Sequence, residues 1–165
     1  MSEATLESRS TDFDFLVGHW TVHHRRLKQR LAECTQWEAF GGTSTLRLLM
    51  GGRGNVDDCV LDLPGGAYRA VTLRSFDPES KQWAIWWLDG RMPHQIEVPM
   101  IGGFGGDGGT FYADEVIGGQ PVRVRFLWSD ITATSCRWQQ AFSLDSGQTW
   151  ETNWIMDFTR ASSPG

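Results

Sequence analysis

Histidine side chains are the first candidates for chemistry in this chain. His19, His23 and His24 lie close together, and His94 stands alone. On a β-strand His19 and His23 point to one side and His24 to the other, because successive side chains alternate. At most two of them converge, which is too few for a zinc site. No histidine follows His94 as a late haem ligand, so we predict neither a metal ion nor another cofactor.

The cysteines and glycines give no clearer catalytic signal. Cys34, Cys59 and Cys136 are an odd number at wide spacing, which favours reduced thiols over a disulfide framework. No neighbouring residue marks any of them as a thiolate nucleophile. Gly103–Gly108 fits the letters of a dinucleotide fingerprint, but a strand follows it where that motif needs a helix. We interpret this stretch as a hairpin loop at a barrel mouth.

Tryptophan spacing indicates the elements that carry these residues. Nine tryptophans and two tyrosines occur in 165 residues. In 122–126 apolar side chains alternate with arginines, and such alternation is typical of half-buried β-strands. Pro-Gly, Asp-Gly and Gly-Gly turns separate the alternating runs. We predict ten strands, at 19–30, 36–49, 55–62, 68–76, 82–88, 95–101, 110–117, 121–129, 134–143 and 150–159.

Strands joined only by turns predict an all-β fold, an antiparallel up-and-down β-barrel of about ten strands. Closure is expected because an open sheet would leave two unpaired edges. A short helical turn that includes Phe13 and Leu16 precedes the first strand. The expected organisation is a flexible N-terminus at 1–12, one barrel domain at 13–160 and a flexible C-terminus at 161–165.

Gly18-His19-Trp20 at the start of the first strand resembles the Gly-x-Trp motif of the calycin superfamily, the lipocalin-like barrels. The resemblance implies that Trp20 plugs the closed end of the barrel beneath an arginine from late in the chain, for which Arg160 is the match. Segments 15–27, 125–132 and 148–154 resemble an uncharacterised bacterial family of calycin-like proteins. That likeness covers Phe13 to Arg160 and implies a fold without an established activity.

A second short motif is Ser143-Leu-Asp-Ser-Gly-Gln-Thr-Trp150. It is similar to the Ser-x-Asp-x-Gly-x-Thr-Trp hairpin box of sialidase-type propellers. A propeller needs several copies, and this chain has one. We interpret it as a structural turn in which Asp145 accepts backbone amide protons, Gly147 takes a positive φ and Trp150 anchors the hairpin.

The inward face of the barrel contains the candidate binding residues. With Trp20 as inward marker, the parity of the first strand carries Val22, His24 and Arg26 inside. Two points stay open: 68–76 has two plausible inner faces, and one β-bulge would turn His23 and Asn153 inward instead. Other inward candidates are Cys136, Phe142, Trp150, Thr152 and Met156. The predicted ligand-binding residues are Trp20, His24, Arg26, Arg74, Trp128, Trp138, Gln140 and Trp154.

Indoles with one histidine and arginines suit a small hydrophobic or amphipathic ligand, aromatic or fatty, including an anionic one. We therefore predict a binding module. One alternative is a small enzyme that uses His24 as general acid or base and an arginine as clamp. A second alternative is a filled structural barrel that acts through a dimer surface.

Charge and apolar patterning bear on location and partners. A net charge of −5 and a pI near 5.3 argue against nucleic acid or an anionic membrane as partner. The basic cluster 25–30 and the pairs Asp57-Asp58 and Asp114-Glu115 are interpreted as solvated charges. No secretion signal or membrane span is visible, which predicts a cytoplasmic protein. Residues 83–88 are apolar on both faces, so we predict a homodimer with Trp86 or Trp87 facing the partner.

Overall fold

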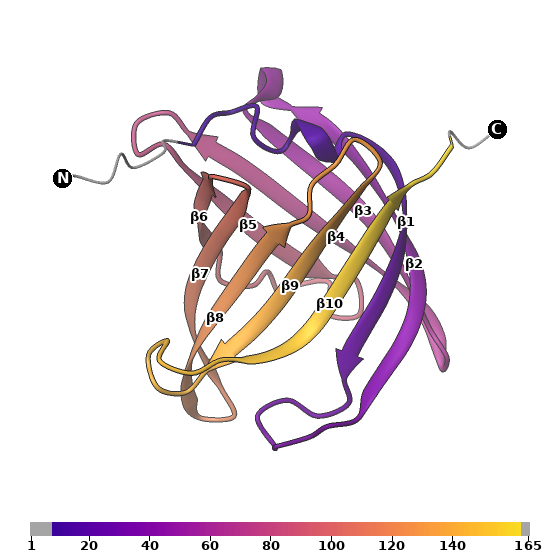
Figure 1. Ribbon diagram of the computed structural model, residues 1–165, viewed down its shortest axis with the longest axis vertical. Helices are drawn as coiled ribbons and strands as arrows, with labels where there is room; N and C mark the ends of the chain where they lie inside the picture. Colours follow the sequence, from indigo (N-terminus) through magenta and orange to yellow (C-terminus); the bar gives the residue numbers. More distant parts are fainter. Residues whose placement is uncertain (1–7, 163–165) are drawn as a thin grey trace.

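The computed structural model describes residues 8–162, and its strands form one closed antiparallel barrel, which confirms the predicted fold (Figure 1). Strands that follow one another in the chain are neighbours in the sheet, and β1 pairs with β10 to close it. No helix of the described residues is long and apolar enough to cross a membrane. The strands are β1 (Gly18–Leu27), β2 (Trp37–Leu49), β3 (Gly54–Leu63), β4 (Gly66–Asp77), β5 (Gln82–Asp89), β6 (Met100–Gly105), β7 (Gly108–Ile117), β8 (Gln120–Ser129), β9 (Ser135–Ser143) and β10 (Glu151–Arg160).

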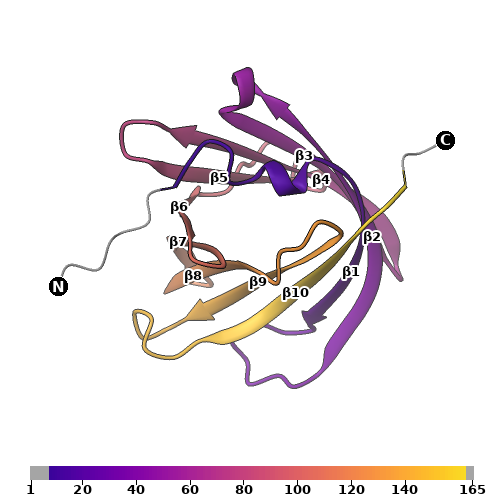
Figure 2. The ribbon, with the colours of Figure 1, turned by 45° about the horizontal axis from the view of Figure 1, so that its top comes forward.

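The N-terminal segment closes one end of the barrel (Figure 2). It contains the short 3-10 helix η1 (Asp14–Leu16), and a second such turn, η2 (Met50–Gly52), follows β2. Phe13 is fully buried and packs edge-on against Trp83 and Phe104, with ring centroids 4.9 and 4.8 Å apart. The Phe104 amide donates to the Ser8 hydroxyl over 2.8 Å. The described part of the segment that we expected to be flexible, from Ser8 to residue 12, therefore packs on the barrel, and residues 1–7 and 163–165 lie outside the described residues.

Arg160 and Trp20 form the predicted contact at this closed end. The guanidinium carbon lies 4.2 Å from the centroid of the Trp20 ring. The same group donates hydrogen bonds to the carbonyls of Phe15, Val17 and Ala133, over 2.9, 2.7 and 3.0 Å. The Trp20 indole donates to the carbonyl of Leu16 over 2.9 Å. Arg160 thus joins β10 to the N-terminal segment that closes the barrel, which we call the plug (Ser8–Val17), and to the loop between β8 and β9.

A β-bulge interrupts β10. Pairing with β9 passes from Thr152↔Ala141 to Trp154↔Gln140, so Asn153 is an extra residue. Asn153 and Trp154 are both buried, whereas Thr152 is only half-buried. The prediction that Thr152 faces inward is therefore wrong, because the bulge breaks the alternation.

Trp150 is a second correction to the inward face. It lies before β10 in the hairpin, against the outward-facing Tyr112 at a centroid distance of 6.1 Å. The hairpin itself has the expected form, since Asp145 accepts the amide protons of Gln148 and Thr149 over 3.1 and 2.8 Å. Gly147 has a φ of 93°. Asp145 and Gly147 therefore take the roles expected of them in a structural turn.

The connection between β5 and β6 differs most from expectation. The predicted strand at 95–101 begins only at Met100, because Pro93 and Pro99 cannot donate to a ladder. An isolated bridge, Leu88↔Ile96, and the hydrogen bonds of Arg91 and Met92 to Asp89 join residues 90–99 to β5. The glycine-rich stretch that follows is mostly paired strand, with Gly105↔Gly108 closing a tight hairpin. A side chain at Gly103 would collide with Ser8, so this hairpin lies at the plugged end and the mouth-loop interpretation is wrong.

We predict that R160A lowers the free energy of unfolding by about 2 kcal/mol, because three charge-assisted hydrogen bonds and a cation–π contact are lost. Urea unfolding followed by tryptophan fluorescence measures this change. The matched control is R69A, which removes an exposed arginine paired only with Asp58 at 2.9 Å and costs about 0–1 kcal/mol. Equal losses in the two variants would contradict the structural role of Arg160.

Candidate ligand-binding site

The barrel encloses a cavity of about 340 Å³, within the range of small-molecule pockets. It reaches the end away from the plug, where the exposed Arg30 and Arg91 line it. The Trp138 ring stands perpendicular to that of Trp154 at 5.3 Å, and the Trp87 ring stands perpendicular to that of Trp154 at 6.1 Å. The indoles that line the cavity are Trp87, Trp128, Trp138 and Trp154.

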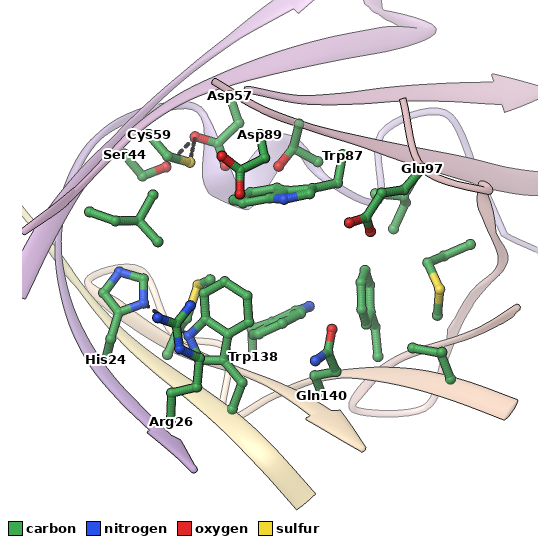
Figure 3. Close-up of a pocket in the computed structure, with 18 of the residues that line it drawn as sticks. His24, Arg26, Ser44, Asp57, Cys59, Trp87, Asp89, Glu97, Trp138 and Gln140 are labelled. Atoms are coloured by element: carbon green, nitrogen blue, oxygen red, sulfur yellow. Dashed lines mark hydrogen bonds between the residues drawn. The ribbon is translucent and has the colours of Figure 1, made fainter. Parts of the chain in front are cut away.

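Most of the residues selected from the sequence come together around this cavity (Figure 3). Trp20 is the exception, because its ring belongs to the plug. The ambiguity in 68–76 is resolved in favour of the face with Tyr68, Thr72 and Arg74. A role in ligand binding stays a prediction for the residues that do line the cavity: His24, Arg26, Arg74, Trp128, Trp138, Gln140 and Trp154.

His24 is a buried, neutral side chain in the wall. The Trp154 indole donates to its Nδ1 over 3.1 Å, and the ring of Phe40 stacks on it at 4.6 Å. Burial, together with the charges of Arg26 and His23, lowers the pKa of His24 to about 3. Since Nδ1 accepts this hydrogen bond, the neutral ring carries its own proton on Nε2. His24 therefore neither takes up a proton at neutral pH nor offers Nδ1 as a base.

Arg26 lies nearer the mouth and has its own counterion. Its guanidinium is 3.3 Å from the carboxylate of Glu38 and 3.4 Å from the hydroxyl of Tyr68. The guanidinium carbon lies 5.2 and 5.1 Å from the rings of Phe40 and Trp154. The interpretation of the basic cluster as a solvated face is therefore wrong for Arg26, whose side chain is only 17% exposed.

Arg74 is the centre of a polar network near the plugged end. It donates to Asn55 over 2.9 Å and lies 3.5 Å from the carboxylate of Asp57. The Ser44 hydroxyl and the Cys59 thiol both donate to Asp57 (Figure 3). Asp57 is 3% exposed, so its interpretation as a solvated charge is wrong. Burial and the neighbouring Asp57 raise the pKa of Cys59 well above its ordinary value, which leaves an unreactive thiol.

Sequence reasoning missed one wall of the cavity. The sequence left open whether Trp86 or Trp87 faces a partner, and neither was among the predicted ligand-binding residues; Trp87 lines the cavity, while Trp86 takes the outer face opposite Leu73. Alternation from the buried Trp83 would have found it, because Trp83 and Trp87 share a parity. Glu115, interpreted as solvated, also lines the cavity, as do Arg91 and the acidic Asp89 and Glu97.

We predict that His24 makes the protein less stable as the pH falls. The unfolded chain takes up this proton near pH 6.5 and the folded chain only near 3, so protonation favours unfolding between these values. The expected loss from about pH 7.5 to about pH 5.5 is about 1.4 kcal/mol, measured by urea unfolding. H24Q should lose this dependence, and H23Q, on the exposed face of the same strand, should keep it. An unchanged dependence in H24Q would contradict the buried neutral state.

Two solved structures share the fold. An S-type phycobiliprotein lyase, CPES from Guillardia theta, superimposes with a TM-score of 0.62 at 12% identity over 96% of both chains. EF1p2_mFAP2b bound to DFHBI gives a TM-score of 0.50 at 8% identity over 93% of this chain and all of the other. No protein-family model and no curated protein sequence matches the chain. At such identities the likeness concerns the fold alone, which is a lipocalin-like antiparallel barrel.

Proposed function

We propose that the barrel binds a small, largely aromatic molecule in its central cavity. The observation that carries this proposal is a cavity of about 340 Å³, closed at one end by the plug and walled by indoles. Flat aromatic walls favour a ring that stacks or packs edge-on between them. Both similar structures support the proposal by analogy, one as a phycobiliprotein lyase and the other as a protein bound to DFHBI.

The enzyme alternative has less support from the geometry. It requires His24 to exchange a proton near neutral pH, but the pKa of His24 is lowered to about 3 and Nδ1 is held by Trp154. Its arginine clamp would be Arg26 or Arg74, and each already has a carboxylate partner. The filled-barrel alternative conflicts with the size of the cavity. A binding protein is therefore the function that this site supports best.

Filling the cavity tests the proposal. Thr72 lines the cavity on β4 between Asp57 and Trp87, so T72F should reduce ligand affinity about tenfold or more by occupying the ring's space. Quenching of tryptophan fluorescence by naphthalene derivatives, lauric acid and haem measures binding.

The control is T21F, which adds the same side chain to an exposed position on β1. Binding of a ring compound to the unmodified protein and to T21F, with loss in T72F, is the expected result. No quenching by any compound of the panel would overturn the proposal.

We also propose a homodimer through the outer face of β5, where Ala84, Trp86 and Leu88 lie half-buried. A second copy would cover these apolar side chains. Light scattering should give twice the monomer mass for the unmodified protein and the monomer mass for W86S. A monomer at micromolar concentration would refute the dimer.

We also propose a cytoplasmic location, since the free cysteines suit a reducing compartment.

A further inference from the structure

Four arginines and four acidic side chains line the cavity, and Glu38, outside the lining, adds a fifth carboxylate that pairs with Arg26. Most of the arginines are neutralised by a carboxylate of the barrel itself, which leaves them little capacity for a ligand anion. Arg91, for example, lies 2.7 Å from Asp89, and its hydrogen bonds hold the pKa of that carboxyl below its ordinary value. The paired groups are Arg26 with Glu38, Arg74 with Asp57, and Arg91 with Asp89.

Negative charge is left over at the mouth. Glu97, from the connector between β5 and β6, and Glu115, on β7, both line the cavity there. Arg30, which lies over the ring of Phe142 at 5.5 Å, is the arginine of the cavity lining whose charge acts on both carboxylates. Within residues 8–162 no ion pair joins Arg30 to either carboxylate. Two carboxylates therefore share the charge of one arginine that forms an ion pair with neither.

Desolvation and mutual repulsion act on this pair. Partial loss of surrounding water raises the pKa of Glu97, although the residue is exposed at the mouth, and the charge of Glu115 raises it further, while Arg30 acts in the opposite direction. Burial likewise raises the pKa of Glu115. A cation placed between the two carboxylates would relieve both effects, because it attracts the charged form of each group.

Gln140 provides an independent acceptor deeper in the cavity. The residue is 8% exposed, and its amide nitrogen donates to Asn153 over 2.9 Å. The amide oxygen then points into the cavity, across from the carboxylate of Glu97 (Figure 3). No donor of the described part of the chain reaches this oxygen. This oxygen is not among the fully buried polar atoms that lack a partner, so it is open to the cavity, where it can accept a hydrogen bond from a ligand donor.

We infer that the cavity takes an aromatic molecule that carries a protonated amine. Its ring packs among Trp87, Trp138 and Trp154, and its ammonium group donates to Glu97, Glu115 and the Gln140 oxygen. An ammonium has donors and no acceptor, and the indole faces attract a cation. This inference rests on the proposed function and replaces the anionic ligand expected from His24 and Arg26.

Compounds that share one ring and differ in charge show how much the charge of the ligand contributes to its affinity. The probes are naphthylmethylamine, naphthalenemethanol and naphthoate, with the same ring position substituted, titrated by calorimetry at neutral pH. We expect the amine to bind about tenfold more tightly than the alcohol, and the acid to bind most weakly. Added salt should reduce the preference for the amine, because the carboxylates at the mouth are reached by solvent.

Variants that remove the carboxylates test whether Glu97 and Glu115 cause the preference for the amine. In E97Q/E115Q the affinity for the amine should fall to that for the alcohol, while the affinity for the alcohol stays unchanged and shows that the barrel is folded. The control is E79Q, which removes a carboxylate in the exposed turn after β4 and should leave the amine preference intact. If the double variant fails to fold, E97Q alone tests the same point, because Glu97 lies in the irregular connector.

The outcomes distinguish this inference from the proposed function. If none of the ring compounds binds, the binding function itself fails. If all three bind equally, or if naphthoate binds most tightly, the binding function stands and the amine inference is overturned. An amine preference that survives in E97Q/E115Q also overturns it.

Discussion

The contact between Arg160 and Trp20 sets the geometry on which the cavity depends. These two residues are register partners at the seam where β1 meets β10, so the contact that closes the sheet also anchors the plug. The seam register then places His24 opposite Met156 and Arg26 opposite Trp154. Because the guanidinium also holds the carbonyls of Phe15 and Val17, the plugged end is closed and a ligand has only the other end to enter.

Internal pairing of charges explains how so polar a barrel keeps its cavity. An arginine as buried as Arg74 is costly unless its charge and its donors are satisfied. Asp57 and Asn55 supply a countercharge and an acceptor, and the ring of Phe13 lies 4.9 Å from the guanidinium on the plug side, while Arg74 Nε has no hydrogen-bond partner among the described residues. The network therefore joins the plug to the floor of the cavity. Polar groups that already have partners within the barrel wall need no partner across the cavity. They can therefore line the cavity and leave it open.

Alternation of side chains was enough to predict nine of the strands and the inward face of β1, because both depend on local backbone geometry, whereas the strand expected at 95–101 begins only at Met100. It was not enough for Asp57 or Glu115. Parity tells which face of a strand a carboxylate occupies, but whether that face is solvated depends on strands far away in the sequence. Asp57 is satisfied by Arg74 of the next strand and by Ser44 of the previous one, and a pattern within β3 contains neither.

The bulge at Asn153 shows how a local irregularity that the sequence leaves open can shape the site. A regular β10 would direct only one of Asn153 and Trp154 inward, whereas the bulge buries both. Trp154 can then donate a hydrogen bond to the neutral form of His24, while Asn153 accepts a hydrogen bond from the amide of Gln140. In this arrangement the Gln140 oxygen faces the cavity. The extra residue in one strand therefore brings both partners of this hydrogen bond into the cavity wall.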